Sequence, residues 1–241
     1  GDPNKNLATF VTTYMEPEAS DVIAENLHRN YIDHAEYPRT AEISKRCVRM
    51  IHDLFNGPGE PDMPGTATVG SSEAVMLGGL AMKWRWKENR RKAGQYDANP
   101  NLVYGGDVHV VWDKFCRYFD VEARKVDIPE GKTTVGVEEL GPQIDENTIG
   151  VVGVAGTTFT GECDDLEALD KHLIGLRDDK GLDVPMHVDA ASGGFVFPFS
   201  HPDFKWDFRL ESVKSINTSG HKFGLVYPGV GWLIMRDDEQ I

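Results

Sequence analysis

The stretch Ser215-Ile216-Asn217-Thr218-Ser219-Gly220-His221-Lys222-Phe223-Gly224 places a lysine beside a histidine, with glycines on both sides and a polar run before it. Glycine has no Cβ, so a backbone or a bound group can approach closely at such a place. An amine held there can form a Schiff base if its surroundings keep part of it unprotonated. A surface lysine in a turn has the same local pattern, so this stretch alone leaves both interpretations open.

A second stretch, His187-Val188-Asp189-Ala190-Ala191-Ser192-Gly193-Gly194, ends an apolar run with a carboxylate. The small residues after Asp189 would let a backbone or a cofactor come close. The alternative is an aspartate that only initiates a turn. Together the two stretches indicate an amine and a carboxylate that each follow a strand.

Around these stretches, apolar segments that suit strands alternate with segments that suit helices. The predicted strands are 102–104, 122–126, 149–155, 186–189, 212–217 and 231–235. The predicted helices are 20–28, 41–55, 70–89, 112–119, 137–144 and 165–177, with Ser20 and Thr40 as expected N-caps of the first two. Residues 1–20 are expected to form an extended arm, and Tyr37-Pro38 and residues 56–65 to be loops.

This alternation predicts an α/β fold, a mainly parallel sheet with helices on both faces. Ligands of such sheets bind at the carboxyl ends of the strands. Thr157-Thr158, Asp189 and Lys222 each follow a predicted strand, so they are expected to converge there.

Gly70-Ser71-Ser72-Glu73 opens the third predicted helix. The first turn of a helix offers unpaired N–H groups and the positive end of its dipole, and two hydroxyls lie beside them. That combination suits a phosphate. Serines that only cap the helix are the alternative.

Composition excludes several classes of function. The 241 residues fit one large domain or two small ones, and a formal net charge of −14 argues against binding to nucleic acid or to an anionic membrane. No apolar run approaches the ~20 residues that span a bilayer, and the start Gly1-Asp2-Pro3-Asn4 does not suit a signal peptide. Cys47, Cys116 and Cys163 are scattered and suggest a reducing compartment. The eight histidines lack metal-ligand spacing, so no metal site is predicted. No Gly-x-Gly-x-x-Gly follows the first strand, which disfavours a nicotinamide-binding protein.

Several further motifs accompany the two stretches in a fixed order from about Asn6 to Arg236. They are Asn6-Leu7-Ala8-Thr9-Phe10, Tyr37-Pro38, Gly70-Ser71-Ser72-Glu73-Ala74, Met82-Lys83-Trp84-Arg85-Trp86, Asn147-Thr148-Ile149-Gly150-Val151-Val152 and Trp206-Asp207-Phe208-Arg209. With these motifs the chain resembles the glutamate decarboxylase group of the pyridoxal-phosphate-dependent amino acid decarboxylases. The ordered set is far more specific than any one motif.

The resemblance implies a fold-type I transferase-like large domain. Residues 1–40 would form an N-terminal arm and substrate-side segment, and residues 41–241 the domain that binds pyridoxal 5'-phosphate. Family members continue into a smaller C-terminal domain, which this sequence is expected to lack. A homodimer or a higher homo-oligomer in the cytoplasm is also implied.

The resemblance also assigns the cofactor site. Lys222 would form the Schiff base, and Asp189 would pair with the protonated ring nitrogen. His109 would stack on the ring, a position where many relatives have histidine but the bacterial and plant glutamate enzymes have glutamine. The remaining expected cofactor contacts are Ser71, Ser72, Thr158, Ser219 and His221. Apart from the family, a histidine in the apolar strand expected at His109 is more often a core residue.

On the substrate side, Thr9, Asn30 and Asp33 match the positions that line the side-chain end of glutamate in the family. Capping and turn roles are the alternative for these residues. Asp33 could meet a substrate carboxylate only if protonated or through another group, because two bare carboxylates repel.

The function implied is decarboxylation of L-glutamate to γ-aminobutyrate and carbon dioxide through a lysine Schiff base. Three alternatives remain open. The substrate could be an aromatic amino acid, it could be aspartate, or the chain could be a catalytically silent domain that binds the cofactor.

Overall fold

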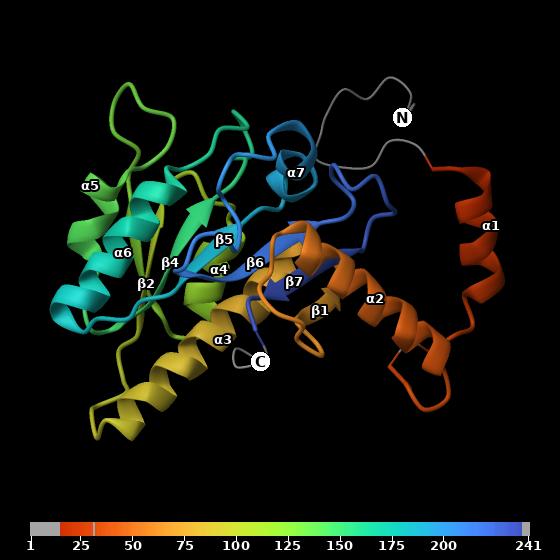
Figure 1. Cartoon of the computed structure of the whole chain (residues 1–241), viewed down its shortest axis with the longest axis horizontal. Helices are drawn as coiled ribbons and strands as arrows, with labels where there is room; N and C mark the ends of the chain where they lie inside the picture. The colour runs from red at the N-terminus through yellow and green to blue at the C-terminus, as the bar shows by residue number, and fades with distance from the viewer. Residues whose placement is uncertain (1–14, 31, 238–241) are drawn as a thin grey trace.

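The computed structural model describes residues 15–30 and 32–237, and a seven-stranded sheet forms its centre (Figure 1). The strand order is β1-β7-β6-β5-β4-β2-β3. The strands are β1 (Gly65–Thr68), β2 (Asn101–Gly105), β3 (Glu122–Val126), β4 (Thr148–Val154), β5 (Met186–Asp189), β6 (Val213–Ser219) and β7 (Gly231–Met235). The pairs β3/β2, β2/β4, β4/β5 and β5/β6 are parallel, whereas β7 is antiparallel to both of its neighbours.

Helices cover both faces of this sheet. They are α1 (Pro17–Asn26), α2 (Pro38–Leu54), α3 (Ser71–Lys92), α4 (Val111–Tyr118), α5 (Val137–Leu140), α6 (Leu166–Lys180) and α7 (Phe197–Ser200), with short 3-10 turns at Gly141–Gln143 and Gly193–Phe195. Leu102 and Tyr104 of β2 pack in the cluster of α3 and α4, whereas Val103 packs in the cluster of α2 and α6. Successive strand residues thus point to opposite faces and bury both. The predicted fold class is confirmed.

The first two helices begin earlier than the sequence predicted. α1 begins at Pro17 and α2 at Pro38, so Ser20 and Thr40 lie inside the helices instead of capping them. Proline suits the first helical position because its fixed φ is already helical and its missing N–H has no partner there. The prediction of a loop at Tyr37-Pro38 was therefore wrong for Pro38.

Three details around the strands also differ from the predictions. β1 was not predicted, because it is a four-residue edge strand that directly follows a Pro/Gly-rich loop. β6 continues to Ser219, two residues beyond its predicted end. His109 lies in the exposed loop between β2 and α4, not in a strand, because β2 ends at Gly105.

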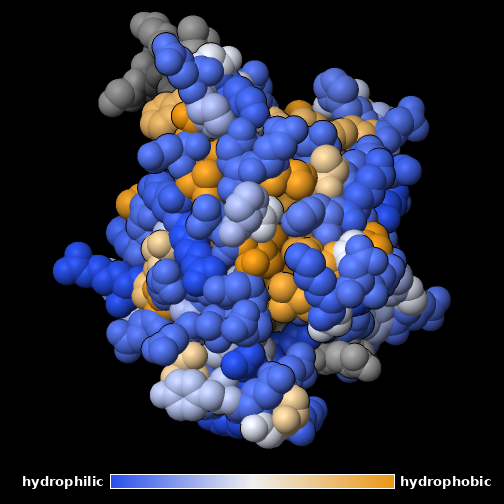
Figure 2. Space-filling view, turned by 90° about the vertical axis from the view of Figure 1, so that its left-hand side faces the viewer, coloured by the Kyte–Doolittle hydropathy of each residue, from blue (hydrophilic) through white to orange (hydrophobic). Residues whose placement is uncertain are grey.

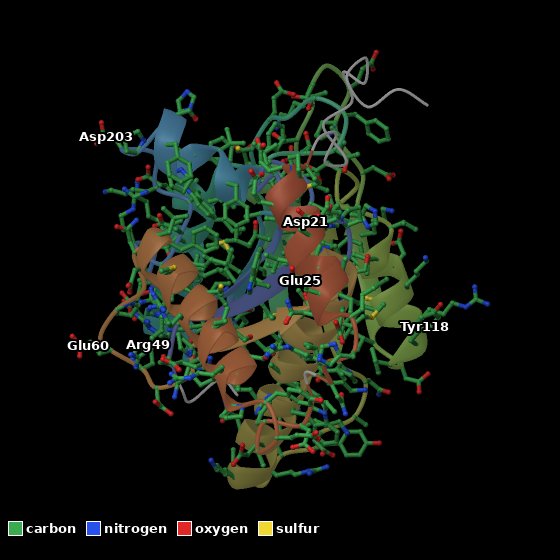
Figure 3. The ribbon with its side chains drawn as sticks, turned by 90° about the vertical axis from the view of Figure 1, so that its right-hand side faces the viewer. Asp21, Glu25, Arg49, Glu60, Tyr118 and Asp203 are labelled. Atoms are coloured by element: carbon green, nitrogen blue, oxygen red, sulfur yellow. The ribbon has the colours of Figure 1, made fainter. Side chains whose placement is uncertain are left out.

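α1 lies at the outside of the molecule, where Figure 3 shows Asp21 and Glu25 on it. None of its residues is buried; Val22 exposes 59% of its surface, and Leu27, directly after the helix, exposes 78%. A hydrogen bond of 2.5 Å between Ser20 Oγ and Tyr227 Oη joins it to the loop before β7. This helix therefore adds little to the core of the chain.

The surface on the side of α5 and α6 is mostly hydrophilic, with hydrophobic side chains showing between the polar ones (Figure 2). Such a mixture is ordinary for a folded domain. Within the described residues, no helix combines the length and the apolar character that crossing a membrane requires.

Candidate active site

A cavity of about 230 Å³ lies where the carboxyl ends of β5 and β6 meet the N-terminus of α3. All predicted cofactor residues except Thr158 line this cavity. Its lining includes Ser71, Ser72, His109, Asp189, Ser219, His221 and Lys222. Of the residues expected to converge at the carboxyl edge of the sheet, Asp189 and Lys222 line this cavity, whereas Thr157 and Thr158 line a neighbouring one.

Three donors fix the carboxylate of Asp189, the last residue of β5. The indole Nε1 of Trp112 donates to Oδ2 over 2.9 Å. The amide Nδ2 of Asn217 donates to Oδ1 over 2.9 Å, and the N–H of Ala191 donates to the same oxygen over 3.2 Å. The side chain is 5% exposed, yet it lines the cavity. This carboxylate is an oriented acceptor, not a residue of a surface turn.

Behind Asp189, a buried histidine orients Asn217. His187 Nε2 donates to Asn217 Oδ1 over 2.8 Å, and the hydroxyl of Ser215 lies 2.6 Å from His187 Nδ1. Burial lowers the pKa of His187, so the ring is neutral and can use one nitrogen as donor and the other as acceptor. Gly78 of α3 allows the helix to pass over this ring, because a Cβ there would lie 2.9 Å from His187 Cε1.

The sequence did not assign roles to these supporting residues. Trp112, His187 and Asn217 contact Asp189 or its partner and hold it in place. A signal was present in β6, where Ser215, Asn217 and Ser219 alternate and therefore share one face of the strand. Polar residues at every second position of a buried strand indicate a polar site on that face.

Lys222 follows β6 by three residues and brings its amine into the cavity. Burial lowers its pKa, and the negative charge of Asp189 opposes part of that shift. Its Nζ lies 3.5 Å from the hydroxyl of Ser192, a long hydrogen bond. A larger share of this amine is therefore unprotonated, and nucleophilic, than in an exposed lysine.

His109 borders the cavity from the loop before α4. Its Nδ1 accepts the N–H of Val111, the first residue of α4, over 3.2 Å. Burial lowers the pKa of His109, an effect that the positive charge of Lys222 strengthens and that Asp189 opposes. The ring is therefore held neutral with its proton on Nε2, as the bond from Val111 requires.

The N-terminus of α3 meets the end of β6 at a very short separation. Ser71 Oγ lies 2.5 Å from Ser219 Oγ. Gly70 has φ of 150°, a conformation that side chains disfavour, and a Cβ at Gly231 would lie 2.7 Å from the carbonyl carbon of Gly70. These glycines allow a helix N-terminus, two serines and His221 to line one small space, which suits a phosphate group.

Thr158 lies in a neighbouring cavity of about 620 Å³, which His109 also lines. The hydroxyl of Thr157 lies 2.7 Å from that of Thr160 and shapes the same loop. Thr158 thus borders the site from the far side of His109, and its contact with a cofactor stays a prediction.

The predicted substrate residues are not brought into the cavity. Thr9 lies outside the described residues. Asn30 and Asp33 are exposed on the segment between α1 and α2, where Asp33 Oδ1 accepts the N–H of Glu36 over 2.9 Å. Asn30 Oδ1 accepts the N–H of Ile32 over 3.4 Å. In this chain both act as turn residues, and their role towards a substrate stays a prediction.

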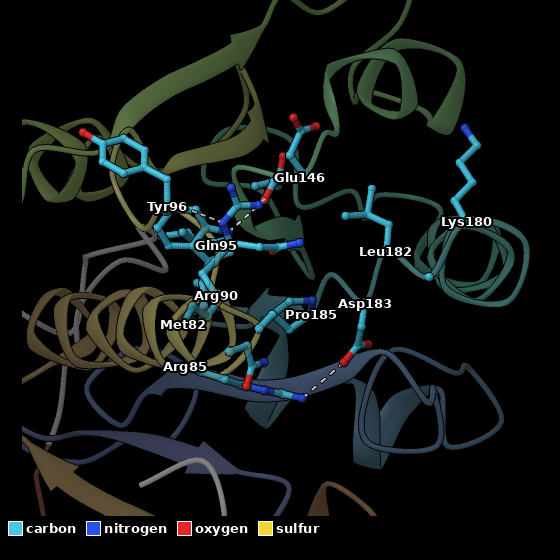
Figure 4. Close-up of a pocket in the computed structure, with 16 residues that line it drawn as sticks. Met82, Arg85, Arg90, Gln95, Tyr96, Glu146, Lys180, Leu182, Asp183 and Pro185 are labelled. Carbon is cyan, nitrogen blue, oxygen red and sulfur yellow. Dashed lines mark hydrogen bonds and ion pairs between the residues drawn. The ribbon is translucent and has the colours of Figure 1, made fainter.

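A larger cavity, about 730 Å³, lies at the opposite edge of the sheet, where β4 and β5 begin (Figure 4). Arg85 contacts Asp183 over 3.4 Å, and Arg90 donates to the carbonyl oxygens of Tyr96 and Glu146 over 2.7 and 3.3 Å. None of the described residues predicted for the site lines it. Arg85 and Arg90 thus already interact with other residues of the chain.

Solved structures define the class of protein to which this fold belongs. A glutamate decarboxylase from Lactobacillus brevis superposes with a TM-score of 0.95 at 47% identity, over 100% of this chain and 55% of that one. A sphingosine-1-phosphate lyase from Burkholderia pseudomallei shares the fold at a TM-score of 0.82 and 23% identity, over 99% of this chain and 55% of that one. The sheet and its helices are thus those of the large domain of pyridoxal-phosphate-dependent decarboxylases.

The sequence comparisons give the family. The conserved domain of pyridoxal-dependent decarboxylases matches residues 1–241. Glutamate decarboxylase 1 of Arabidopsis thaliana is 49% identical over 243 residues, and glutamate decarboxylase of Lactococcus lactis subsp. cremoris is 50% identical over 244 residues. The chain belongs to the pyridoxal-dependent decarboxylase family, and the predicted resemblance is confirmed.

The alignments cover all of this chain but 48% and 52% of those two relatives, so the chain spans about half of their length. The family implies pyridoxal 5'-phosphate as the cofactor, which confirms the predicted cofactor. The cavity fits that group: the helix N-terminus with Ser71 and Ser219 suits its phosphate, the buried amine of Lys222 its aldehyde, and Asp189 a protonated ring nitrogen.

Proposed function

We propose that the protein containing this chain removes the α-carboxylate of L-glutamate and releases γ-aminobutyrate and carbon dioxide. One observation carries the proposal: Lys222, the triply held Asp189 and the N-terminus of α3 meet in one cavity. Identities of 49% and 50% to glutamate decarboxylases support glutamate over aspartate and the aromatic amino acids. The predicted enzyme class is accordingly a carbon–carbon lyase.

Each side chain has a definite task in this proposal. When bound, pyridoxal phosphate supplies a ring that accepts the electron pair left behind as carbon dioxide departs. Asp189 holds a proton on the ring nitrogen by charge pairing, and its three donors keep it in position. Lys222 offers its unprotonated amine, and the flat ring of neutral His109 lies against the cofactor. Ser71, Ser72, Ser219 and His221 bind the phosphate, while Thr158 contacts the ring region.

We also propose that Thr9, Asn30 and Asp33 contact the substrate within a homodimer or higher homo-oligomer. Asn30 and Asp33 are exposed and lie outside the cavity of their own chain. The adjoining α1 exposes Val22 and Ile23, as a helix does when it packs against a second copy. Residues 1–40 would then contribute to the site of the partner subunit, and residues 41–241 would hold the cofactor. The helix α2 crosses the boundary between these two segments.

We also propose that the protein is located in the cytoplasm. Cys47, Cys116 and Cys163 are all free thiols in the structure. Free thiols are typical of reducing compartments.

The proposal is tested by incubating the intact protein and pyridoxal phosphate with L-glutamate, L-aspartate and aromatic L-amino acids in turn. We expect carbon dioxide and γ-aminobutyrate from L-glutamate and little product from the others. Preferred turnover of an aromatic amino acid or aspartate would replace the proposed substrate. A protein that binds the cofactor but releases carbon dioxide from none of them would be the silent alternative.

Ser71→Ala is expected to weaken binding of pyridoxal phosphate by about 10- to 100-fold, the cost of one hydrogen bond to a charged group. The measurement is a titration of the cofactor followed by absorbance. Ser200→Ala is the matched control, since Ser200 is exposed on α7 and bonds to Val196 O and His201. Equal affinities of the Ser71 variant and the unmodified protein would remove Ser71 from the phosphate site.

A further inference from the structure

The carboxyl groups of Asp107 and Asp164 interact beside His109. Asp107 lies two residues before His109, and Asp164 lies on the segment that returns after β4. Both oxygens of Asp107 and Oδ1 of Asp164 are buried, and no described residue outside the pair provides them with a hydrogen bond. Buried polar atoms without partners are rare in native proteins, so this pair requires an explanation.

Each carboxyl group is held in place by its own loop. Asp164 is 4% exposed, its Oδ2 accepts the N–H of Val154 over 2.7 Å, and its own N–H donates to Val154 O over 3.0 Å. Asp107 folds back over Gly105, where a Cβ would lie 2.3 Å from Asp107 Oδ1. Only glycine permits that close contact, so Gly105 makes room for the carboxyl group of Asp107.

The two lysines that line the cavities beside the pair form ion pairs with other carboxylates. Lys125, which lines the cavity beside Asp107, contacts Asp113 Oδ2 over 3.0 Å. Lys132, which lines the pocket beside Asp164, contacts Glu139 Oε1 over 2.8 Å. The other titratable groups around the pair carry a negative charge or none: they are Glu162, Cys163, Asp165 and the neutral His109. Positive charge therefore does not satisfy these oxygens.

We propose that Asp107 and Asp164 share one proton, and that this proton fixes the loop of His109 to the segment after β4 that carries Thr157 and Thr158. A carboxylate can only accept, so two facing carboxyl groups bond only when one carries a proton. With both ionised they repel, which would push the two loops apart. Asp107 and Asp164 are then positioning residues for His109, and only this last step rests on the proposed function.

The direction of the pH effect follows from the burial of the pair. Burial, and the neighbouring charge of Asp107, raise the pKa of Asp164 to about 8, and burial also raises the pKa of Asp107. The folded chain therefore binds more protons than the unfolded chain between about pH 4 and pH 8. The stability that the shared proton supplies is complete below the ordinary carboxyl pKa and is lost as the pH rises through about 8.

The test compares the intact protein with Asp107→Asn, whose amide can donate to Asp164 without any shared proton. The first readout is the melting temperature of the cofactor-free protein between pH 5 and pH 9. The second is the affinity for pyridoxal phosphate over the same range. Asp127→Asn is the matched control, because Asp127 is exposed on the loop after β3 that adjoins Gly106.

We expect the melting temperature of the unmodified protein and of Asp127→Asn to fall between pH 6 and pH 9, and that of Asp107→Asn to stay nearly level. One pH unit above the pKa, only about a tenth of the molecules keep the proton, so cofactor affinity should fall about tenfold more than in Asp107→Asn. Parallel curves for all three proteins would overturn the proposal.

Asp164→Asn provides a second test from the other half of the pair. If Asp107→Asn does not fold, a level profile of Asp164→Asn supports the shared proton, and a profile parallel to that of the unmodified protein overturns it. The melting curves need no cofactor. If the protein failed to bind pyridoxal phosphate, the proposed function would be contradicted. The melting curves would still show whether Asp107 and Asp164 share a proton.

Discussion

Lys222→Ala is expected to abolish covalent attachment of pyridoxal phosphate and to lower the rate of decarboxylation by about 10³-fold or more, since it removes the reacting amine. Because burial lowers the pKa of Lys222, attachment in the unmodified protein should reach half its maximum at a lower pH than for an exposed lysine. The measurement is the yellow absorbance of the bound cofactor, followed by borohydride reduction and mass spectrometry of the labelled peptide.

Lys214 offers a matched control for this change. It lies on β6, the strand that Lys222 follows, and burial lowers its pKa as well, but it does not line the cavity. Lys214→Ala should keep the yellow band and the label on Lys222. A band that persists in Lys222→Ala, or a label on Lys214, would show that the attachment site has been misassigned.

Asp189→Asn is expected to lower the rate of decarboxylation by about 10²- to 10³-fold, because it removes the charge that pairs with the ring nitrogen. The variant should also lose about 1–3 kcal/mol of folding stability, since the amide nitrogen would face a donor, Trp112 Nε1 or Asn217 Nδ2. Steady-state kinetics and urea unfolding measure the two effects separately.

Asp207→Asn separates loss of charge from loss of stability. Asp207 is 1% exposed and accepts hydrogen bonds from Arg209 and Asn56, but it does not line the cavity. This variant should be destabilised and yet keep its turnover number. An Asp189→Asn protein that loses no more activity than Asp207→Asn would leave Asp189 with a structural role only.

The strands that hold the site were predictable because buried strands have a recognisable pattern of apolar residues in the local sequence. Residues 231–235 form an apolar run after a glycine-rich loop, and residues 186–189 alternate apolar and polar side chains; both are strands with those bounds. No local sequence pattern indicates that β7 is antiparallel or that it lies between β1 and β6. Both features depend on pairing between segments distant in the sequence, which local patterns do not record.

The ends of the strands likewise predicted where Asp189 and Lys222 would meet. The partners of Asp189 were not predictable one by one, because Trp112 and His187 suit a hydrophobic core as well as a hydrogen-bonded network. The predicted starts of the first two helices were wrong for a different reason. Ser20 and Thr40 have the right chemistry for a cap, but the prolines before them begin the helices earlier.

The short contact between Ser71 and Ser219 has a consequence for folding. Its two residues are 148 positions apart, so the cavity cannot exist until β6 has docked and a very long loop has closed. Partly folded chains that lack this contact also lack the phosphate end of the site. The cofactor should therefore bind almost solely to the finished fold and stabilise it by about 2.7 kcal/mol at a hundredfold excess over its Kd. Supply of the cofactor would then raise the fraction of the chain that is folded.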